Sequence, residues 1–79
     1  MSDADDRAVD DLVEAVDHYP NGRLRFRGAN LGGAMHGPWE FFRVDGSLMR
    51  AGTFERGKQV GLWRTYDRAG VVVKETRFK

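Results

Sequence analysis

Alternating arginines give this chain its clearest capacity for binding chemistry. Arg23, Arg25 and Arg27 are spaced two residues apart, so in a β-strand they would point to one face. A row of guanidinium groups with aromatic rings nearby can bind the phosphates of nucleic acid or of acidic phospholipid. The same row is typical of an edge strand that is protected against aggregation, and the sequence leaves both interpretations open. Arg64 is a further candidate contact residue.

Residue types that serve catalysis or metal binding are not arranged for either. His18 and His36 are the only histidines and there is no cysteine, so a metal site would need both of them together with converging carboxylates. The glycine-rich stretch 32–37 lacks the Lys-Ser/Thr ending of a phosphate-binding loop. Ser47 follows a turn and does not stand in a nucleophile elbow. We therefore expect a protein that is not an enzyme and that has no catalytic residue, no metal and no cofactor.

Charge is divided unequally along the chain. Its 79 residues have a formal net charge of +1, but residues 1–18 carry seven acidic side chains against one arginine. Those residues therefore have a net charge of −6, and the rest of the chain has +7. This division favours a polar partner or an internal docking contact. A solvated acidic helix beside a basic sheet is the simpler alternative, because exposed charge pairs contribute little.

The N-terminal segment has the apolar spacing of an amphipathic α-helix. Four apolar residues fall at i, i+3, i+4 and i+7 and form one stripe. They are Val9, Leu12, Val13 and Val16. Asp10 and Glu14 lie off this stripe and are candidate partner contacts, and Pro20 ends the helix just before it. We expect residues 1–20 to form an acidic helix whose stripe packs on the sheet or on a partner protein, because so short a helix is marginal alone.

From residue 21 onward the sequence repeats itself with a 24-residue period. Asn21-Gly22 returns as Asp45-Gly46, and weakly as Ala69-Gly70, and the first two dipeptides are strong signals for tight, primed hairpin turns. Other matched pairs are Gly28 with Gly52, Gly33 with Gly57, Gly37 with Gly61, Trp39 with Trp63, Phe42 with Tyr66 and Phe54 with Phe78. An internal repeat of this kind predicts stacked copies of one unit. We expect two hairpins, over residues 21–44 and 45–68, and a half unit over residues 69–79.

The predicted fold is mainly β, an antiparallel meander of about five strands preceded by the one helix. The strands are expected at 23–30, 37–44, 47–55, 61–67 and 71–78. Trp39 and Trp63 are expected in the core, because large aromatic side chains dominate burial in a chain with few other apolar residues. Gly28 and Gly52 fall inside strands, where a glycine marks a bulge or the close approach of a ring.

The repeated unit resembles a MORN-type repeat, and more closely the variant in bacterial proteins grouped as YwqK-family antitoxins. The pattern is Asp-Gly-x-Leu, Gly-x-Phe, Gly-Lys and Gly-x-Trp-x-x-Tyr, which residues 45–68 match best. The resemblance covers residues 21–79 and not the acidic segment. It departs at Gly33-Ala34, where the family has Gly-Lys, and the last unit lacks the Gly-x-Trp half. The resemblance implies hairpins stacked into an elongated sheet that binds proteins or acidic phospholipids and has no catalytic residues.

These observations together predict a non-enzymatic protein-interaction module. The resemblance makes an antitoxin or immunity-like protein that binds a bacterial toxin the specific form of this hypothesis. The alternative is binding of an anionic surface, acidic phospholipid or nucleic acid, through the basic sheet. A third interpretation is a homodimer joined through an open sheet edge. The lack of cysteine and of a long apolar run favours a cytoplasmic location.

Overall fold

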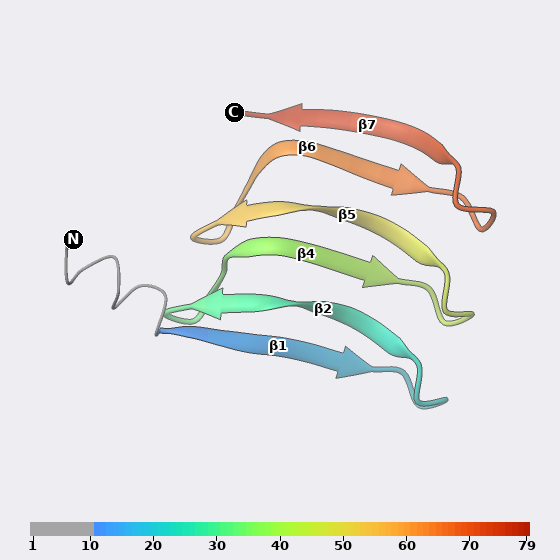
Figure 1. Ribbon diagram of the computed structural model, residues 1–79, viewed down its shortest axis with the longest axis horizontal. Coiled ribbons are helices and arrows are strands. Elements are labelled where there is room, and N and C mark those ends of the chain that lie inside the picture. The colour runs from blue at the N-terminus through green and yellow to red at the C-terminus, as the bar shows by residue number, and fades with distance from the viewer. Residues whose placement is uncertain (1–10) are drawn as a thin grey trace.

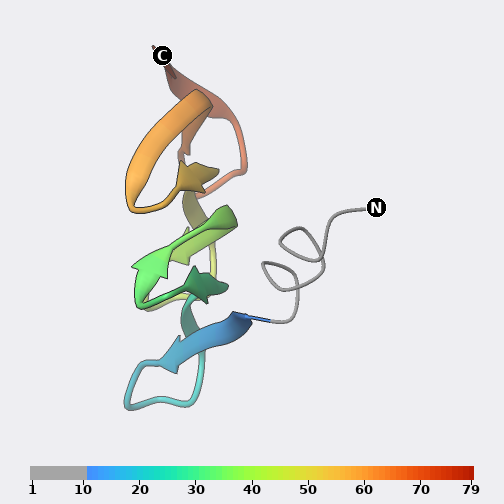
Figure 2. The ribbon, with the colours of Figure 1, turned by 90° about the vertical axis from the view of Figure 1, so that its left-hand side faces the viewer.

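A computed structural model describes residues 11–79 as a single antiparallel β-sheet (Figure 1). The strands are β1 (Leu12–His18), β2 (Leu24–Leu31), β3 (Ala34–Met35), β4 (Gly37–Phe42), β5 (Leu48–Glu55), β6 (Lys58–Tyr66) and β7 (Val72–Phe78). Their order in the sheet is β1-β2-β4-β5-β6-β7, and the short β3 pairs with β2. The hairpins stack in one layer, with β1 at one end and β7 at the other (Figure 2). The mainly β class and the antiparallel meander are thereby confirmed.

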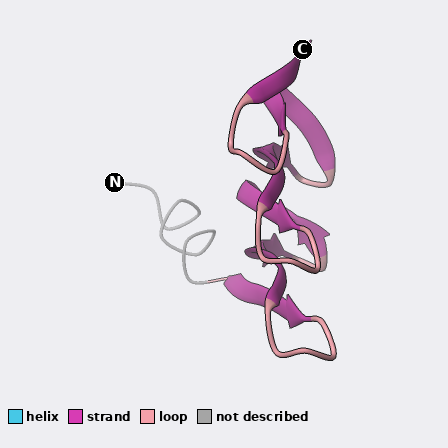
Figure 3. Cartoon of the chain, turned by 90° about the vertical axis from the view of Figure 1, so that its right-hand side faces the viewer, coloured by secondary structure: helices cyan, strands magenta, loops and turns pink. Residues whose placement is uncertain are grey.

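The five expected strands correspond to β2, β4, β5, β6 and β7, and their ends differ from the prediction by at most three residues. The agreement follows from the turns, whose glycines punctuate the chain at fixed intervals. Residues 11–79 contain strands and loops and no helix (Figure 3).

The helix predicted over residues 1–20 is wrong over the part of it that the structure describes. Residues 1–10, and with them Asp10, lie outside the described residues. Leu12–His18 instead forms β1, which pairs antiparallel with β2. The repeat extends further back than residue 21, because Ala15 stands one full period before Trp39. Pairing with β2 satisfies the backbone of this segment and overrides its helical spacing of apolar residues.

The turns are of two kinds, and the primed turns are not where the sequence predicts them. In the turn that contains Asn21-Gly22, the amide of Gly22 donates to the carbonyl of Tyr19 at 2.9 Å, and only the glycine has a positive φ, of 86°. This is a type I turn followed by a glycine bulge, and Pro20 suits its second position. The equivalent turns around Gly46 and Gly70 have the same bonds and lie at the same end of the strands (Figure 3).

Primed turns lie at the opposite end of the strands. Gly32-Gly33 has φ values of 58° and 85°, and Arg56-Gly57 has 49° and 90°. Each pair is a two-residue loop, closed by Leu31 with Ala34 or by Glu55 with Lys58. Positive φ at both central positions identifies the type I′ turn.

The core lies on one face of the sheet and is built from aromatic rings. Trp39, Phe54 and Trp63 are buried, and the partly buried Ala15, Phe26, Phe41 and Phe78 pack against them. Each indole covers a glycine of a neighbouring strand in the sheet, β2 for Trp39 and β5 for Trp63. Each also donates its N–H to a carbonyl ten residues earlier, Ala29 O at 2.9 Å from Trp39 and Thr53 O at 3.1 Å from Trp63. The expected core role of both tryptophans is confirmed.

Candidate functional site

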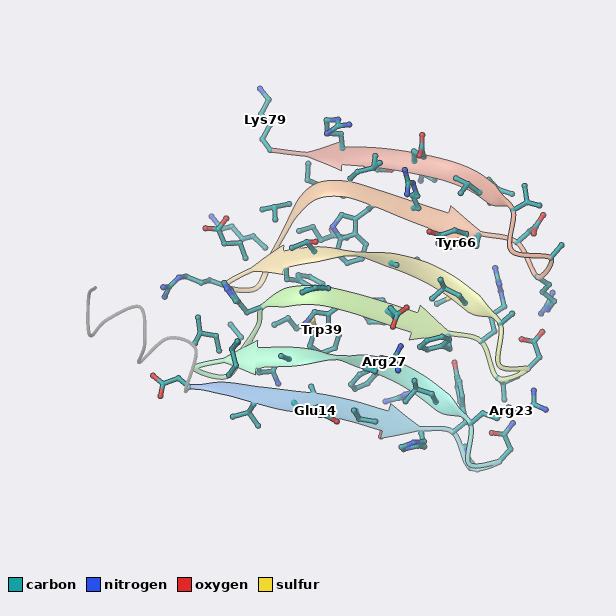
Figure 4. All side chains as sticks on the ribbon, viewed as in Figure 1. Glu14, Arg23, Arg27, Trp39, Tyr66 and Lys79 are labelled. Atoms are coloured by element: carbon teal, nitrogen blue, oxygen red, sulfur yellow. The ribbon has the colours of Figure 1, made fainter. Side chains whose placement is uncertain are left out.

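The predicted contact arginines Arg27 and Arg64 form ion pairs within the sheet. Arg27, labelled on β2 in Figure 4, lies directly across from Glu40 on the neighbouring strand and binds its carboxylate at 2.5 Å. Arg64 and Glu75 are opposite in the same way, with 2.9 Å between Arg64 Nε and Glu75 Oε2. This hydrogen bond raises the pKa of Arg64. Both arginines therefore have carboxylate partners in the chain itself.

The other two predicted contact arginines also have acceptors in the chain. Arg25 binds Asp17 on β1 at 2.5 Å, and Arg23 donates through a terminal guanidinium nitrogen to the carbonyl of Asp45 in the next turn. Glu14, the remaining predicted contact residue that the structure describes, lies on β1, opposite Ala29. Arg23, Arg25 and Arg27 therefore do not form an unneutralised cationic row.

One charged row crosses the sheet on the face opposite the core. Residues that lie opposite each other on neighbouring strands share a face, and this row passes from β1 to β7 through five such pairs. Its members are Val16, Arg27, Glu40, Ala51, Arg64 and Glu75. The charges alternate in sign around Ala51. The row depends on strand register, which the sequence alone does not reveal.

Successive glycine-bulge turns are hydrogen-bonded to one another at one end of the sheet. Asn21 Nδ2 donates to Val44 O at 2.9 Å, and Arg68 Nε donates to Asp45 Oδ2 at 2.8 Å. Asp45 Oδ1 also accepts from the hydroxyl and the amide of Ser47, at 2.6 and 2.9 Å. These hydrogen bonds, those from Ser47 first, lower the pKa of Asp45 to about 2. The bonds made by Asn21 and Arg68 connect successive turns and stack the repeats in register.

Two cations on the core face were not among the predicted contacts. Arg50 lies over the ring of Trp63, with 4.8 Å from its guanidinium carbon to the ring centroid, and also near Phe41 at 5.6 Å. Lys74 lies on the same face, and within residues 11–79 neither cation has a carboxylate within ion-pair distance. A shallow groove of about 240 Å³ runs between them, lined also by Gln59, Thr65, Thr76 and Phe78. The 24-residue repeat could have pointed to these two cations, because Arg50 and Lys74 both stand at the repeat position that Phe26 occupies in the first unit.

A second and larger groove lies toward β1 on the core face. It measures about 500 Å³ and is lined by residues of β1 and β2 together with Met35, Trp39 and Phe41. Ala15 stands at the position that tryptophan fills in the other two units, which leaves this end of the face open.

The terminal strands β1 and β7 each pair with one neighbour in the described part of the chain. Both carry exposed apolar side chains, and the largest exposed fractions are 65% for Val13 and 61% for Val73. Five of the eight exposed large apolar side chains among the described residues lie on these two strands: Leu12, Val13, Val16, Val72 and Val73. Apolar exposure is therefore concentrated at the two ends of the sheet.

The histidines remain apart. His36 Nδ1 accepts from the backbone amide of Arg56 at 3.1 Å, and His18 lies at the end of β1. Residues 11–79 contain no group of three or more His, Cys, Asp or Glu side chains placed to hold a metal ion. Among the same residues, no helix is long and apolar enough to cross a membrane. No family model, no curated protein and no solved structure matches this chain.

Proposed function

We propose that this chain is a non-enzymatic protein-interaction module that binds an extended segment of a partner protein by adding it as a strand to β1 or β7. The observation that carries this proposal is the concentration of exposed apolar side chains on the two terminal strands of a single-layer sheet. A sheet edge offers backbone N–H and C=O groups to an incoming strand, and alternate side chains give it specificity. Val72 and Val73 supply apolar contacts of this kind on β7.

Capture of a partner from an extract of the native host tests the proposal. Immobilised protein should retain one stoichiometric protein, and Val73→Lys should abolish that retention, because a charge at the edge opposes strand addition. Val44→Lys is the matched control, since Val44 is also an exposed valine but lies in a turn between β4 and β5. Retention that survives Val73→Lys as well as it survives Val44→Lys would remove β7 as the binding edge.

The specific form of the proposal is an antitoxin or immunity-like protein whose partner is a bacterial toxin. The likeness of residues 45–68 to the YwqK-type repeat supports this form. Expression of the captured partner alone should arrest bacterial growth, and co-expression with this chain should restore it. A captured partner that is harmless when expressed alone would contradict the antitoxin form of the proposal.

Binding of an anionic surface is the second candidate function. Arg50 and Lys74 support it, because they share the core face with Trp63 and lack carboxylate partners within residues 11–79. Binding to single-stranded nucleic acid or to vesicles of acidic phospholipid should then weaken as salt is raised. Arg50→Gln/Lys74→Gln should abolish it, whereas the control Arg27→Gln/Arg64→Gln should leave most of it. Equal losses from the two variants would show only a response to net charge.

A further inference from the structure

The repeat specifies which strand would continue the sheet beyond β7. The chain alternates two kinds of strand, and successive strands of the same kind stand one repeat period apart. One kind enters the glycine-bulge turn and comprises β1, β4 and β6, and the other leaves that turn and comprises β2, β5 and β7. A strand of the second kind pairs with the next strand of the first kind where β2 meets β4 and where β5 meets β6. The strand β7 is of the second kind, and β1 of another molecule is of the first.

We propose that β7 of one molecule pairs antiparallel with β1 of a second molecule, so that copies of this chain join head to tail into a continuous sheet. This inference rests on the proposed use of the terminal strands for protein binding, and it names a second copy of the chain as one such partner. Both strands carry exposed apolar side chains.

The register of this pairing follows from the pairings inside the chain. Positions one repeat period apart are equivalent, and two sets of such positions lie opposite each other in the sheet. Phe26 lies opposite Phe41 where β2 pairs with β4, and Arg50 lies opposite Thr65 where β5 pairs with β6. The first set is Phe26, Arg50 and Lys74, and the second is Asp17, Phe41 and Thr65. The same arrangement puts Lys74 of one molecule opposite Asp17 of the next. A cation and a carboxylate thus meet at the first equivalent pair.

A second pair of opposite charges follows from the regularity of β1. The strands β4 and β6 depart from a regular ladder near Gly37 and Gly61, which have positive φ values of 84° and 68°. Val13 stands at the same repeat position in β1 and has no positive φ, so β1 lacks the glycine at which β4 and β6 depart from the ladder. The register therefore continues, and Arg77 falls opposite Glu14 of the next molecule.

The two charge pairs lie on opposite faces of the joined sheet. Lys74 faces the core side, opposite Thr65, whereas Arg77 lies opposite Leu62 on the other side. Opposite charges across a strand pair stabilise it and like charges destabilise it, so the arrangement selects the β7–β1 pairing. Charged residues on an edge otherwise discourage indiscriminate strand addition. Because this contact joins two different strands, a dimer still has one unpaired β1 and one unpaired β7, so assembly should continue beyond dimers.

A two-fold pairing of β7 with β7 is the competing arrangement. If it were centred on Thr76, it would place Glu75 opposite Arg77 twice and would not involve β1. This arrangement closes at a dimer and is indifferent to the charges of β1. Charge reversal on the two strands separates the arrangements.

The test uses two full-length variants, one for each strand. The β7 variant is Lys74→Glu/Arg77→Glu, and the β1 variant is Glu14→Lys/Asp17→Lys. Sedimentation velocity over a dilution series should show that the wild-type chain grows in size with concentration. Either variant alone should raise the dissociation constant roughly tenfold or more, because two attractive pairs become repulsive. An equimolar mixture should associate as the wild type does, because the introduced acids then face the introduced lysines.

The variant Arg56→Glu/Lys58→Glu is the matched control for the β7 variant. It changes net charge by the same amount in the turn between β5 and β6 and at the first residue of β6, and should associate like the wild type. Hydrogen exchange of the wild-type chain adds a measurement that does not depend on how the variants fold. Protection of β1 and β7 amides should rise together with concentration, while amides of β4 and β5 stay unchanged.

A wild-type chain that remains monomeric throughout the dilution series would overturn the inference. A β1 variant that associates like the wild type would also overturn it, in favour of the two-fold arrangement. Failure here is distinguishable from failure of the proposed function. A monomeric chain that captures a different protein through Val73 leaves the proposed function standing, whereas a self-associating chain that captures no other protein leaves only the inference.

Discussion

The indole ring of Trp63 lies directly on the backbone of Gly52. A Cβ atom built on Gly52 would lie 2.1 Å from Cδ2 of Trp63, and the same relation joins Gly28 to Trp39 at 2.2 Å. Each contact connects the two long strands of one repeat unit, β2 with β4 and β5 with β6. The two most conspicuous residue types of the repeat therefore serve one purpose, which is to let a single-layer sheet bury its largest rings against its own backbone.

Substitution of Gly52 by alanine should destabilise the chain by about 1–3 kcal/mol, because the added methyl overlaps the Trp63 ring. Urea unfolding followed by tryptophan fluorescence measures the change. Gly33→Ala is the matched control, since a Cβ there meets nothing within 4 Å and only its φ of 85° is unfavourable. The control should cost roughly 1 kcal/mol. If Gly52→Ala proves no more harmful than Gly33→Ala, the ring does not limit this position.

Removal of the Trp63 ring should cost about 3–5 kcal/mol in the free energy of unfolding, which is a large share of the stability of so small a domain. Trp63→Ala leaves a cavity in the core and deprives Thr53 O of the indole donor. Calorimetry or chemical denaturation checks the value. Val71→Ala, at an exposed site, should change stability by no more than about 0.5 kcal/mol. Similar losses from both variants would contradict the assignment of the core.

The ion pair between Arg27 and Glu40 should couple weakly. Both side chains are partly exposed to solvent, so a double-mutant cycle with Arg27→Gln and Glu40→Gln should give about 0.2–1 kcal/mol. Raising the ionic strength should reduce that coupling, because salt screens exposed charges. A coupling that is larger than this and insensitive to salt would indicate that the pair is shielded from solvent in the folded chain.

The carboxyl group of Asp45 should titrate with a pKa of about 2 in the folded chain, against an ordinary value of 3.8. A pKa lowered by folding stabilises the chain above the ordinary value, and that contribution is lost as the pH falls from 3.8 toward 2. NMR titration of the carboxyl carbon measures the pKa directly. Ser47→Ala should raise it more than Arg68→Gln, because the hydrogen bond from the Ser47 hydroxyl has the largest effect. The reverse order would show that the charge of Arg68 dominates.

Much of the strand layout could be predicted because its signals are local. Glycines recur at the same positions of each unit, and the turns that they permit define where strands end. The close approach of a ring to Gly28 and Gly52 was also predictable, since a glycine inside a strand needs such a reason. The turn type was less accessible. Asn21-Gly22 is compatible with a primed turn and with a glycine bulge, and the loop length between the paired strands decides between them.

The segment before Asn21 and the candidate contacts illustrate what local reasoning misses. The apolar spacing of Leu12, Val13 and Val16 fits one face of a helix, yet the segment joins the sheet because β2 has an edge to pair. The arginines of β2 were candidate contacts for an anionic partner or protection of an edge strand, and the ion pair of Arg27 with Glu40, thirteen residues away, was not predicted. Such a meeting depends on the register between strands and not on any pattern within one strand.

The architecture of repeated β-hairpins, with a tryptophan in the units 21–44 and 45–68, follows from the amino-acid order alone, because turn glycines and the period of the repeat act through neighbouring residues. The edge-strand role of residues 12–18, and the neutralisation of Arg27 and Arg64 within the sheet, emerge only in the folded molecule. These features could not be read from the sequence because strand pairing brings distant segments together in one register, and the free energy of pairing depends on both segments.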